Sequence, residues 1–113
     1  MDGNCNNEMV ERTKMAKGYW IAHVKVTDPE RYKDYVTANA KAFEKFNAKF
    51  LVRGGQNESR ATAHDYDRHV VLEFESFDAA KACYDSDEYQ AARLIRDEAS
   101  EAYVTIIEGW DAS

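Results

Sequence analysis

Four short runs of the chain alternate between apolar and polar positions, and this pattern predicts β-strands. The runs are rich in β-branched and aromatic residues, as strands usually are. They cover Tyr19–Val26, Lys49–Arg53, Arg68–Phe74 and Tyr103–Glu108. Residues 54–67 between two of them are polar and aperiodic, so we expect a long loop there.

Two other stretches carry apolar side chains every three or four residues, which is the spacing of one helix face. The first helix is expected from Pro29 to about Phe46, because Asp28 is a suitable N-cap and proline favours the first helical position. The second is expected in two parts, Phe77–Tyr84 and Asp87 to about Glu101, since residues 85–88 form a break. The side chains expected to face inward are Tyr32, Tyr35, Val36, Phe43 and Phe46 from the first helix and Tyr89, Ala92, Ile95 and Ala99 from the second.

The order of these elements is βαββαβ, which predicts an α+β fold of the ferredoxin-like kind. In that fold a four-stranded antiparallel sheet carries both helices on one face. With 113 residues, of which 44% are apolar, the chain is long enough to build one core. We expect residues 1–15 to be a disordered leader and residues 16–113 to form a single domain.

The two faces of the predicted sheet differ in composition, because side chains alternate across a strand. One set of strand residues is nearly all apolar and is expected to face the helices: Trp20, Ala22, Val24, Phe50, Val52, Val70, Leu72, Phe74, Thr105 and Ile107. The other set mixes Ile, Val and Leu with charged and polar residues, namely His23, Arg53, His69, Glu73 and Glu108. Such a face is too apolar for water and too charged for a core. We therefore expect a homodimer in which the sheets of two copies face each other.

Composition excludes several classes of function. The net charge of −6 disfavours a nucleic-acid partner, because phosphate binding requires a basic surface. No apolar run approaches the about 20 residues that span a bilayer, and the first 14 residues contain no signal-peptide core, so we expect a cytoplasmic protein without a membrane partner. Cys5 and Cys83 are expected to be a free tail thiol and a buried core thiol. No cysteine or histidine spacing fits a zinc site, and we expect neither a metal nor a cofactor.

His23 and Glu73 are the candidate catalytic residues. Imidazole titrates near neutral pH and can act as a general acid or base, and a nearby carboxylate can orient it. Both residues are expected on the mixed face of the sheet. The alternative is that they form a structural pair at the dimer interface.

Arg53, Gly54 and Tyr35 are candidate substrate-binding residues. Arginine holds carboxylates through two parallel hydrogen bonds, and glycine lets the backbone approach a ligand closely. The alternative for Arg53 is an ion pair with Glu73 or Glu108, with Gly54 only turning the chain. The hydroxyl of Tyr35 can orient a substrate oxygen, but tyrosine also fills cores well.

The helix break supplies four further candidates for substrate binding, which are Tyr84, Ser86, Tyr89 and Arg93. Free backbone amides at the start of a helix attract anions, and an arginine adds positive charge. The alternative is simple capping, with Ser86 as the N-cap and Arg93 paired to a nearby carboxylate.

Four segments together resemble a known family. They are GYWIAHVKVTDPERYKDYV, FLVRGG, VVLEFESFDAAKACYDSDEYQAARLIR and IIEG. They are similar to the family called domain of unknown function 1330, within the dimeric α/β-barrel superfamily. The resemblance covers about residues 15–110 and implies a ferredoxin-like protomer and a homodimer. It implies no single reaction, since the superfamily includes cofactor-independent monooxygenases, muconolactone isomerases, haem-handling proteins and binding modules. The segment QNESRATAHDYD departs from the more apolar segment of relatives.

Two functions are compatible with these observations. The first is a small cofactor-independent enzyme of monooxygenase or isomerase type that acts on a small polar or aromatic metabolite, for which an enclosed pocket of about 300 Å³ or more is expected. The second is a non-catalytic dimeric module that binds a metabolite or a partner. RNA binding through the sheet is disfavoured, because Glu73 and Glu108 stand on the face where stacking aromatic residues are needed.

Overall fold

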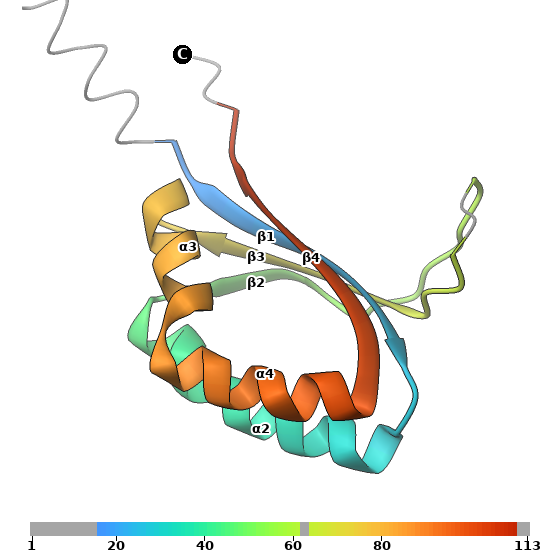
Figure 1. The fold of residues 1–113 in the computed structure, drawn as a ribbon. Helices are drawn as coiled ribbons and strands as arrows, with labels where there is room; N and C mark the ends of the chain where they lie inside the picture. The colour runs from blue at the N-terminus through green and yellow to red at the C-terminus, as the bar shows by residue number, and fades with distance from the viewer. Residues whose placement is uncertain (1–15, 62–63, 111–113) are drawn as a thin grey trace, which may run out of the picture.

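The computed structural model describes residues 16–61 and 64–110, so the expected leader over residues 1–15 and Cys5 lie outside the described residues. Four strands form one antiparallel sheet: β1 (Gly18–Val26), β2 (Lys49–Arg53), β3 (Arg68–Phe74) and β4 (Ser100–Glu108). Their order across the sheet is β2-β3-β1-β4. The helices α2 (Pro29–Lys45), α3 (Phe77–Asp85) and α4 (Asp87–Ala99) lie on one side of the sheet (Figure 1). The predicted ferredoxin-like arrangement is confirmed.

Each helix begins at a side chain that caps it. The capping residues are Asp28 for α2, Ser76 for α3 and Ser86 for α4, and each accepts a hydrogen bond of 3.0–3.2 Å from the backbone N–H three residues later. The capping interpretation of Ser86 is thereby confirmed. Helix α4 ends at Ala99, two residues before the predicted end, because Ser100 already has an extended backbone and begins β4.

The core fills the space between the sheet and the helices around Trp20, which is only 2% exposed. Its indole Nε1 donates a hydrogen bond of 2.8 Å to the carbonyl oxygen of Ala80 on α3. Its ring lies 4.8–5.4 Å, centroid to centroid, from the rings of Phe43, Phe74, Tyr84 and Tyr89. The inward positions predicted on the two central strands are confirmed as buried: Trp20, Ala22, Val24, Val70, Leu72 and Phe74.

Strand β2 contains a β-bulge that changes which side chains face the helices. Phe50 pairs with Leu72, but the next residue to pair is Val52, opposite Val71, so Leu51 is an extra residue. Val52, predicted in the core, is therefore 43% exposed on the outer face. The residue that follows it, Arg53, stands opposite Val70 on the helix side, and its predicted place on the outer face was wrong.

The predicted faces of β4 were also wrong. Ile106 stands opposite Trp20, and Val104 stands opposite Ala22, so these two β4 residues pack against the core. Thr105 and Ile107, predicted to face the helices, lie on the outer face. Both alternating sets of this strand are apolar, so its own pattern did not distinguish the faces, and the pairing with β1 decides between them.

Cys83 is a buried thiol, as predicted, and its Sγ lies 3.8 Å from the carbonyl oxygen of Ala42 on α2. Burial, with a smaller contribution from the nearby Glu88 carboxylate, raises the pKa of this thiol from 9.0 to about 12. An unfolded chain therefore loses this proton at a lower pH than the folded chain. The resulting stabilisation is complete below about pH 9 and is lost as the pH rises toward about 12.

The free energy of unfolding in urea should therefore fall between pH 9 and pH 11, and the Cys83→Ala variant should show a shallower fall. The variant has lower stability at pH 8 because it loses buried sulfur, so the comparison uses the slope with pH and not the absolute value. Equal slopes in the two proteins would show that Cys83 does not titrate in this way.

Candidate functional site

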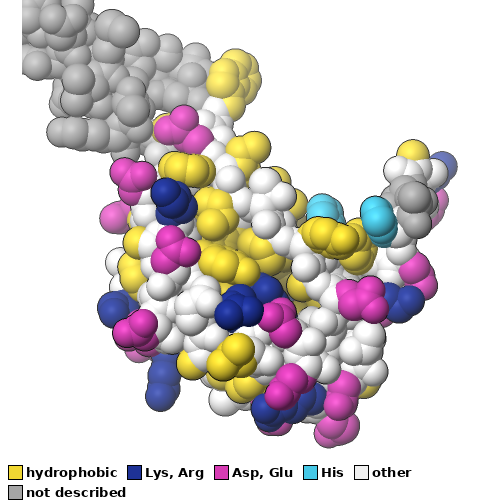
Figure 2. Space-filling model, in the orientation of Figure 1, with side chains coloured by type: hydrophobic (Ala, Val, Ile, Leu, Met, Phe, Trp, Pro, Cys, Tyr) yellow, Lys and Arg dark blue, Asp and Glu magenta, His cyan; other side chains and the backbone are white. Residues whose placement is uncertain are grey.

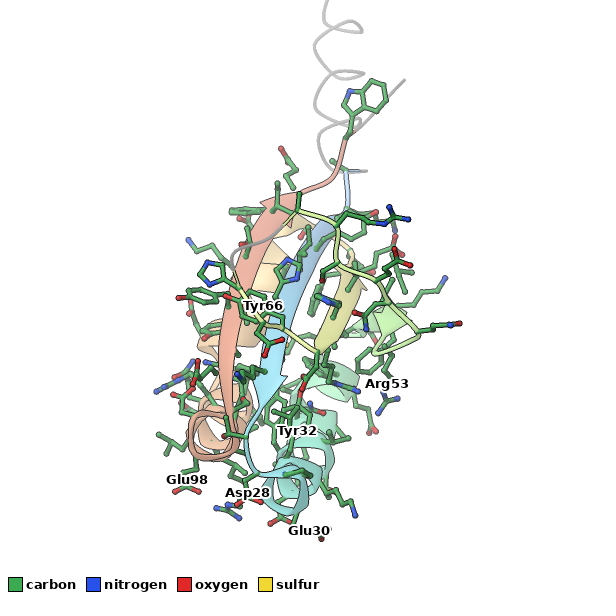
Figure 3. The ribbon with its side chains drawn as sticks, turned by 90° about the vertical axis from the view of Figure 1, so that its right-hand side faces the viewer. Asp28, Glu30, Tyr32, Arg53, Tyr66 and Glu98 are labelled. Carbon is green, nitrogen blue, oxygen red and sulfur yellow. The ribbon has the colours of Figure 1, made fainter. Side chains whose placement is uncertain are left out.

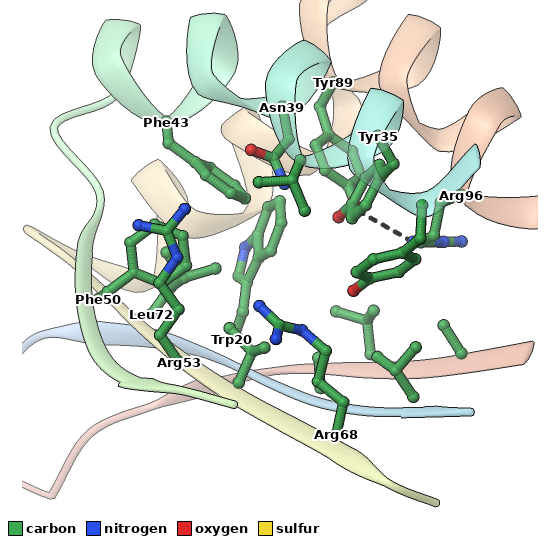
Figure 4. A pocket seen from close by; sticks show the side chains of 17 residues that line it. Trp20, Tyr35, Asn39, Phe43, Phe50, Arg53, Arg68, Leu72, Tyr89 and Arg96 are labelled. Atoms are coloured by element: carbon green, nitrogen blue, oxygen red, sulfur yellow. Dashed lines mark hydrogen bonds between the residues drawn. The ribbon is translucent and has the colours of Figure 1, made fainter. Parts of the chain in front are cut away.

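A cavity lies between the sheet and helix α2, close to the core tryptophan (Figure 4). Most of its wall is aromatic or aliphatic, and the lining residues are Trp20, Ala22, Val24, Tyr32, Tyr35, Val36, Asn39, Phe43, Phe50, Arg53, Arg68, Val70, Leu72, Tyr89, Arg96, Ala102 and Val104. The space open to the centre of a water molecule is about 30 Å³. One water needs about 10–15 Å³ by this measure, so the cavity has room for about two. This cavity is thus much smaller than the enclosed pocket of about 300 Å³ expected for an enzyme.

The cavity continues into a wider surface groove of about 480 Å³. Five residues line both spaces, namely Val36, Asn39, Phe43, Phe50 and Arg53. Helix α2 packs chiefly against α4, and the groove runs between α2 and the edge strand β2. A ligand can therefore place a small group in the cavity and its larger part in the groove.

Four polar side chains form a hydrogen-bonded chain on the helix side of the cavity, and all but Tyr84 line the cavity itself. The hydroxyls of Tyr35 on α2 and Tyr89 on α4 lie 2.7 Å apart. The Nη1 atom of Arg96, a residue only 7% exposed, donates to the hydroxyl oxygens of Tyr89 at 3.1 Å and Tyr84 at 3.2 Å. The Tyr35–Tyr89 hydrogen bond uses only one of the two hydroxyl protons. The other proton remains for donation to a ligand oxygen.

Burial keeps this chain in its protonated form. It raises the pKa of Tyr35 well above the ordinary value, and the neighbouring Tyr89 adds to the rise. Burial also raises the pKa of Tyr89, although the charge of Arg96 opposes the effect. Burial alone disfavours the charged form of Arg96, but the hydroxyls of Tyr89 and Tyr84 outweigh it and raise the pKa of the guanidinium. At neutral pH the chain therefore consists of hydrogen-bond donors beside a fixed positive charge.

Two more arginines line the cavity on the sheet side. Arg68 begins β3 and extends into the space between Trp20 and Tyr35, and its guanidinium carbon lies 5.6 Å from the ring centroid of Tyr32 (Figure 4). Arg53 ends β2, with its guanidinium carbon 4.2 Å from the ring centroid of Phe50. None of the residues that line the cavity is Asp, Glu, His or Lys. The cavity is thus cationic, although the chain as a whole is acidic.

The two candidate catalytic residues are far apart, contrary to the expectation that they pair. His23 stands opposite His69, and Glu73 stands opposite Tyr19, whose hydroxyl donates to it at 3.0 Å. These positions are separated by four residues along the strands, or about 13 Å at about 3.3 Å per residue. Both lie on the outer face, away from the cavity. The sequence placed them on the same face but did not give the register.

His23 belongs instead to a cluster on the outer face beside the long loop. Its Nδ1 lies 2.9 Å from Nδ1 of His69, and its ring stacks on Tyr66 with centroids 5.8 Å apart. Tyr66 also contacts the ring of Tyr103 on β4, so the loop folds back over β1 and β4 (Figure 3). The loop and the sheet enclose an open hollow of about 550 Å³, where histidine and hydrophobic side chains lie side by side (Figure 2). Over the described part of the chain, no three His, Cys, Asp or Glu side chains are grouped to hold a metal ion.

The structure brings three of the predicted binding residues to the cavity, which are Arg53, Tyr35 and Tyr89. Tyr84 lies behind them and is linked through Arg96. Ser86 and Arg93 lie outside the cavity lining: Ser86 caps α4, and Arg93 pairs with Asp97 at 2.8 Å. Gly54 does not line the cavity and lies against Arg68.

Sequence reasoning missed Arg68, Arg96 and Asn39, although two of them carried a signal. Arg96 follows Tyr89 and Ala92 at helical spacing on the inward face, and Arg68 has the same parity as the buried Val70. Both were passed over because arginine is rarely buried.

No helix within residues 16–61 and 64–110 is both long and apolar enough to cross a membrane.

Solved structures with the same fold come from several bacteria. A protein of unknown function from Rhodopseudomonas palustris is 12% identical with a TM-score of 0.66, covering 95% of this chain and 92% of that one. A dimeric ferredoxin-like protein of unknown function from Thermobifida fusca is 21% identical with a TM-score of 0.56, covering 81% and 90%. SnoaB, a cofactor-independent oxygenase from Streptomyces nogalater, is 13% identical with a TM-score of 0.56, covering 81% and 91%.

At these identities the likeness shows the shared fold and carries no function across. A search among functionally curated proteins finds no relative of the chain. The family model is the more specific finding, because it matches residues 17–110, nearly all of the described part. The chain belongs to the family of the domain of unknown function DUF1330.

Proposed function

We propose that the chain binds a small aromatic metabolite, with its polar head group in the cavity beneath α2 and its ring in the adjoining groove, and that it does so as a homodimer. The observation that carries this proposal is the make-up of the cavity wall. Aromatic rings from both layers surround a narrow space in which hydroxyl and guanidinium groups converge. A mostly apolar wall with a few convergent polar groups is typical of small-molecule sites.

The polar groups favour chemistry on an oxygen that carries negative charge. The protonated tyrosines and Arg96 can donate hydrogen bonds to an enolate or phenolate oxygen, which lowers the energy of a reaction that forms such an anion. Enolising isomerases and cofactor-independent oxygenases share this requirement, and SnoaB, which has the same fold, is of the second kind. The residues that line the cavity provide no carboxylate or imidazole as a base. The site therefore suits a substrate that arrives as an anion or loses its proton easily.

Trp20 provides a direct test of ligand binding, because it lines the cavity, whereas Trp110, the other tryptophan of the chain, is 92% exposed. In the Trp110→Phe variant, the fluorescence of Trp20 should change saturably with a panel of benzoate, benzamide and benzyl alcohol. If none of the three changes the emission of Trp20 or the melting temperature at millimolar concentration, the proposed site is wrong. A bound compound recovered unchanged after prolonged incubation favours a binding module over an enzyme.

The outer face of the sheet supports the homodimer. Leu51, Val52, Tyr103 and Ile107 are exposed there, around the half-buried pair of Ile21 and Val71. The described parts of the loop, residues 54–61 and 64–67, extend on the same side, away from the helices, where they can reach a second copy (Figure 1). The fold neighbour from Thermobifida fusca and one from Bacteroides fragilis are both described as dimeric. A second copy would cover these apolar side chains.

The Val71→Glu variant should be monomeric, because it places a carboxylate at the centre of the outer face on both copies. Native mass spectrometry should give twice 13.0 kDa, or 26 kDa, for the unchanged protein and 13.0 kDa for the variant. Ala82→Glu is the matched control, because Ala82 is exposed on α3 on the opposite side of the sheet, and it should remain dimeric. A monomeric unchanged protein, or a dimeric Val71→Glu variant, would contradict this interface.

A further inference from the structure

Arg68 has no carboxylate partner for its charge among the described residues, although its guanidinium interacts with Tyr32. Its Nε is buried and has no hydrogen-bond partner, the only such side-chain atom among the described residues. Neither Arg68 nor Arg53 forms an ion pair with any carboxylate in the described part of the chain. By contrast, the third arginine of the cavity, Arg96, pairs with Asp97 at 3.1 Å.

This arrangement is unfavourable in the empty protein. A buried N–H donor without an acceptor loses its hydrogen bond to water and gains none in return. The guanidinium groups of Arg68 and Arg53 line one cavity and also repel each other, although water partly screens the exposed Arg53. An acidic chain with 21 Asp and Glu residues has many carboxylates, yet none lines this space. The missing negative charge is therefore expected to come from a ligand.

The turn after β2 is shaped to admit the Arg68 side chain. Gly54 has a φ of +67°, and its backbone N–H donates to the carbonyl oxygen of His69 at 2.9 Å. A Cβ atom at Gly54 would lie 2.3 Å from Nη1 of Arg68. The glycine thus serves the backbone conformation and the position of the guanidinium together. Gly54 is not among the residues that line the cavity, but it lies against Arg68, which is.

We propose that Arg68 and Arg53 bind the carboxylate of a small aromatic acid, so that the ligand of this cavity is an organic anion. This inference rests on the proposed function and names its ligand class. Arg53 ends β2 and Arg68 begins the neighbouring antiparallel strand β3, and both line the cavity; Arg53 also lines the groove. Arginine suits a carboxylate because its N–H groups form two parallel hydrogen bonds to the two oxygens.

The size of the cavity assigns the parts of the ligand. A carboxylate is small enough to replace the about two waters that the cavity admits, whereas an aromatic ring is not. The ring therefore lies in the adjoining groove, against Phe43 and Phe50. A second oxygen on the ligand, such as a carbonyl or hydroxyl near the acid group, would face the hydroxyls of Tyr35 and Tyr89.

The test compares three probes on the full chain carrying Trp110→Phe, with Trp20 fluorescence as the readout. Benzoate should bind at least about tenfold more tightly than benzamide, which has the same shape without the charge, and tenfold corresponds to about 1.4 kcal/mol. Sodium sulfate at matched ionic strength should not displace benzoate. Arg68→Gln should raise the Kd of benzoate at least about tenfold while leaving that of benzamide within about twofold.

Two further variants keep the test decisive. Arg53→Gln removes charge at an exposed position, so it should fold, and it should also weaken benzoate selectively. Arg60→Gln makes the same change in net charge on the exposed loop and should change benzoate binding less than twofold. Equal binding of benzoate and benzamide would refute the carboxylate site but leave the proposed cavity intact. Displacement by sulfate would assign the site to inorganic oxyanions instead, and no response to any probe would overturn the proposed function itself.

Discussion

Gly18→Ala should destabilise the protein by about 3 kcal/mol or more, at or above the upper end of the usual effect of overpacking. A Cβ atom at Gly18 would lie 2.2 Å from the carbonyl oxygen of Ser76 and 2.7 Å from the Cα of Phe77. Both contacts are with backbone, so no side chain can turn away to relieve them. The variant must separate β1 from the start of α3, which is also where the Ser76 cap forms. Urea denaturation followed by circular dichroism measures the effect.

Gly55→Ala is the matched control for this substitution. A Cβ atom at Gly55 would meet no atom within 4 Å, so its effect on the free energy of unfolding should stay within about 0.5 kcal/mol. Similar losses in the two variants would mean that the loss of glycine flexibility, and not the contact with α3, sets the stability.

Trp20→Ala should cost about 3–5 kcal/mol of the free energy of unfolding, the range for a large aromatic residue removed from a core. Trp20 contacts aromatic side chains from helices α2 and α4 and from β3, and its indole donates to the carbonyl of Ala80. Removal leaves a void beside the existing cavity and one buried carbonyl without its donor. Since a domain is stable by about 5–15 kcal/mol in total, the variant should lose a large share of its stability, and urea denaturation measures the loss.

Trp110→Ala removes the same side chain from an exposed position and should change the free energy of unfolding by less than about 0.5 kcal/mol. Trp20→Phe should give an intermediate loss, because it keeps an aromatic ring but removes the hydrogen bond to Ala80. A Trp20→Ala variant as stable as Trp110→Ala would show that the tryptophan does not hold the two layers together.

Most of the fold could be predicted because its signals are local. Helix caps such as Asp28 and Ser86 are set by residues within one turn, and the apolar alternation of β1 and β3 has one clear interpretation. The faces of β2 and β4 could not be predicted from their own patterns. The bulge in β2, and the choice between two apolar sets of side chains in β4, depend on how each strand pairs with its neighbour. Register is a non-local property, and a shift of one residue exchanges the faces.

The candidate site was predictable only in part for the same physical reason. Tyr35, Tyr89 and Arg53 were recognised by their chemistry, but the cavity that joins them depends on how α2 sits over the sheet. The proximity of His23 and Glu73 was inferred from a shared face, whereas distance also requires the position along the strand. Arg68 and Arg96 occupy positions that the strand and helix periodicity assigns to the buried face. They were not predicted there because arginine is usually exposed.

The bulge at Leu51 also affects how members of this family should be compared. In a regular strand the same five residues would place Val52 opposite Val70 and Arg53 opposite His69, so the arginine would point outward. In a relative without the bulge, the strand has one residue fewer before the two glycines that correspond to Gly54 and Gly55. An arginine of that relative is matched to Arg53 correctly only if the alignment opens a one-residue gap at the bulge. Equivalent residues should therefore be matched by their partners across the sheet. Residue frequencies taken from an alignment without this gap would combine, in one column, side chains of the cavity with side chains of the outer face.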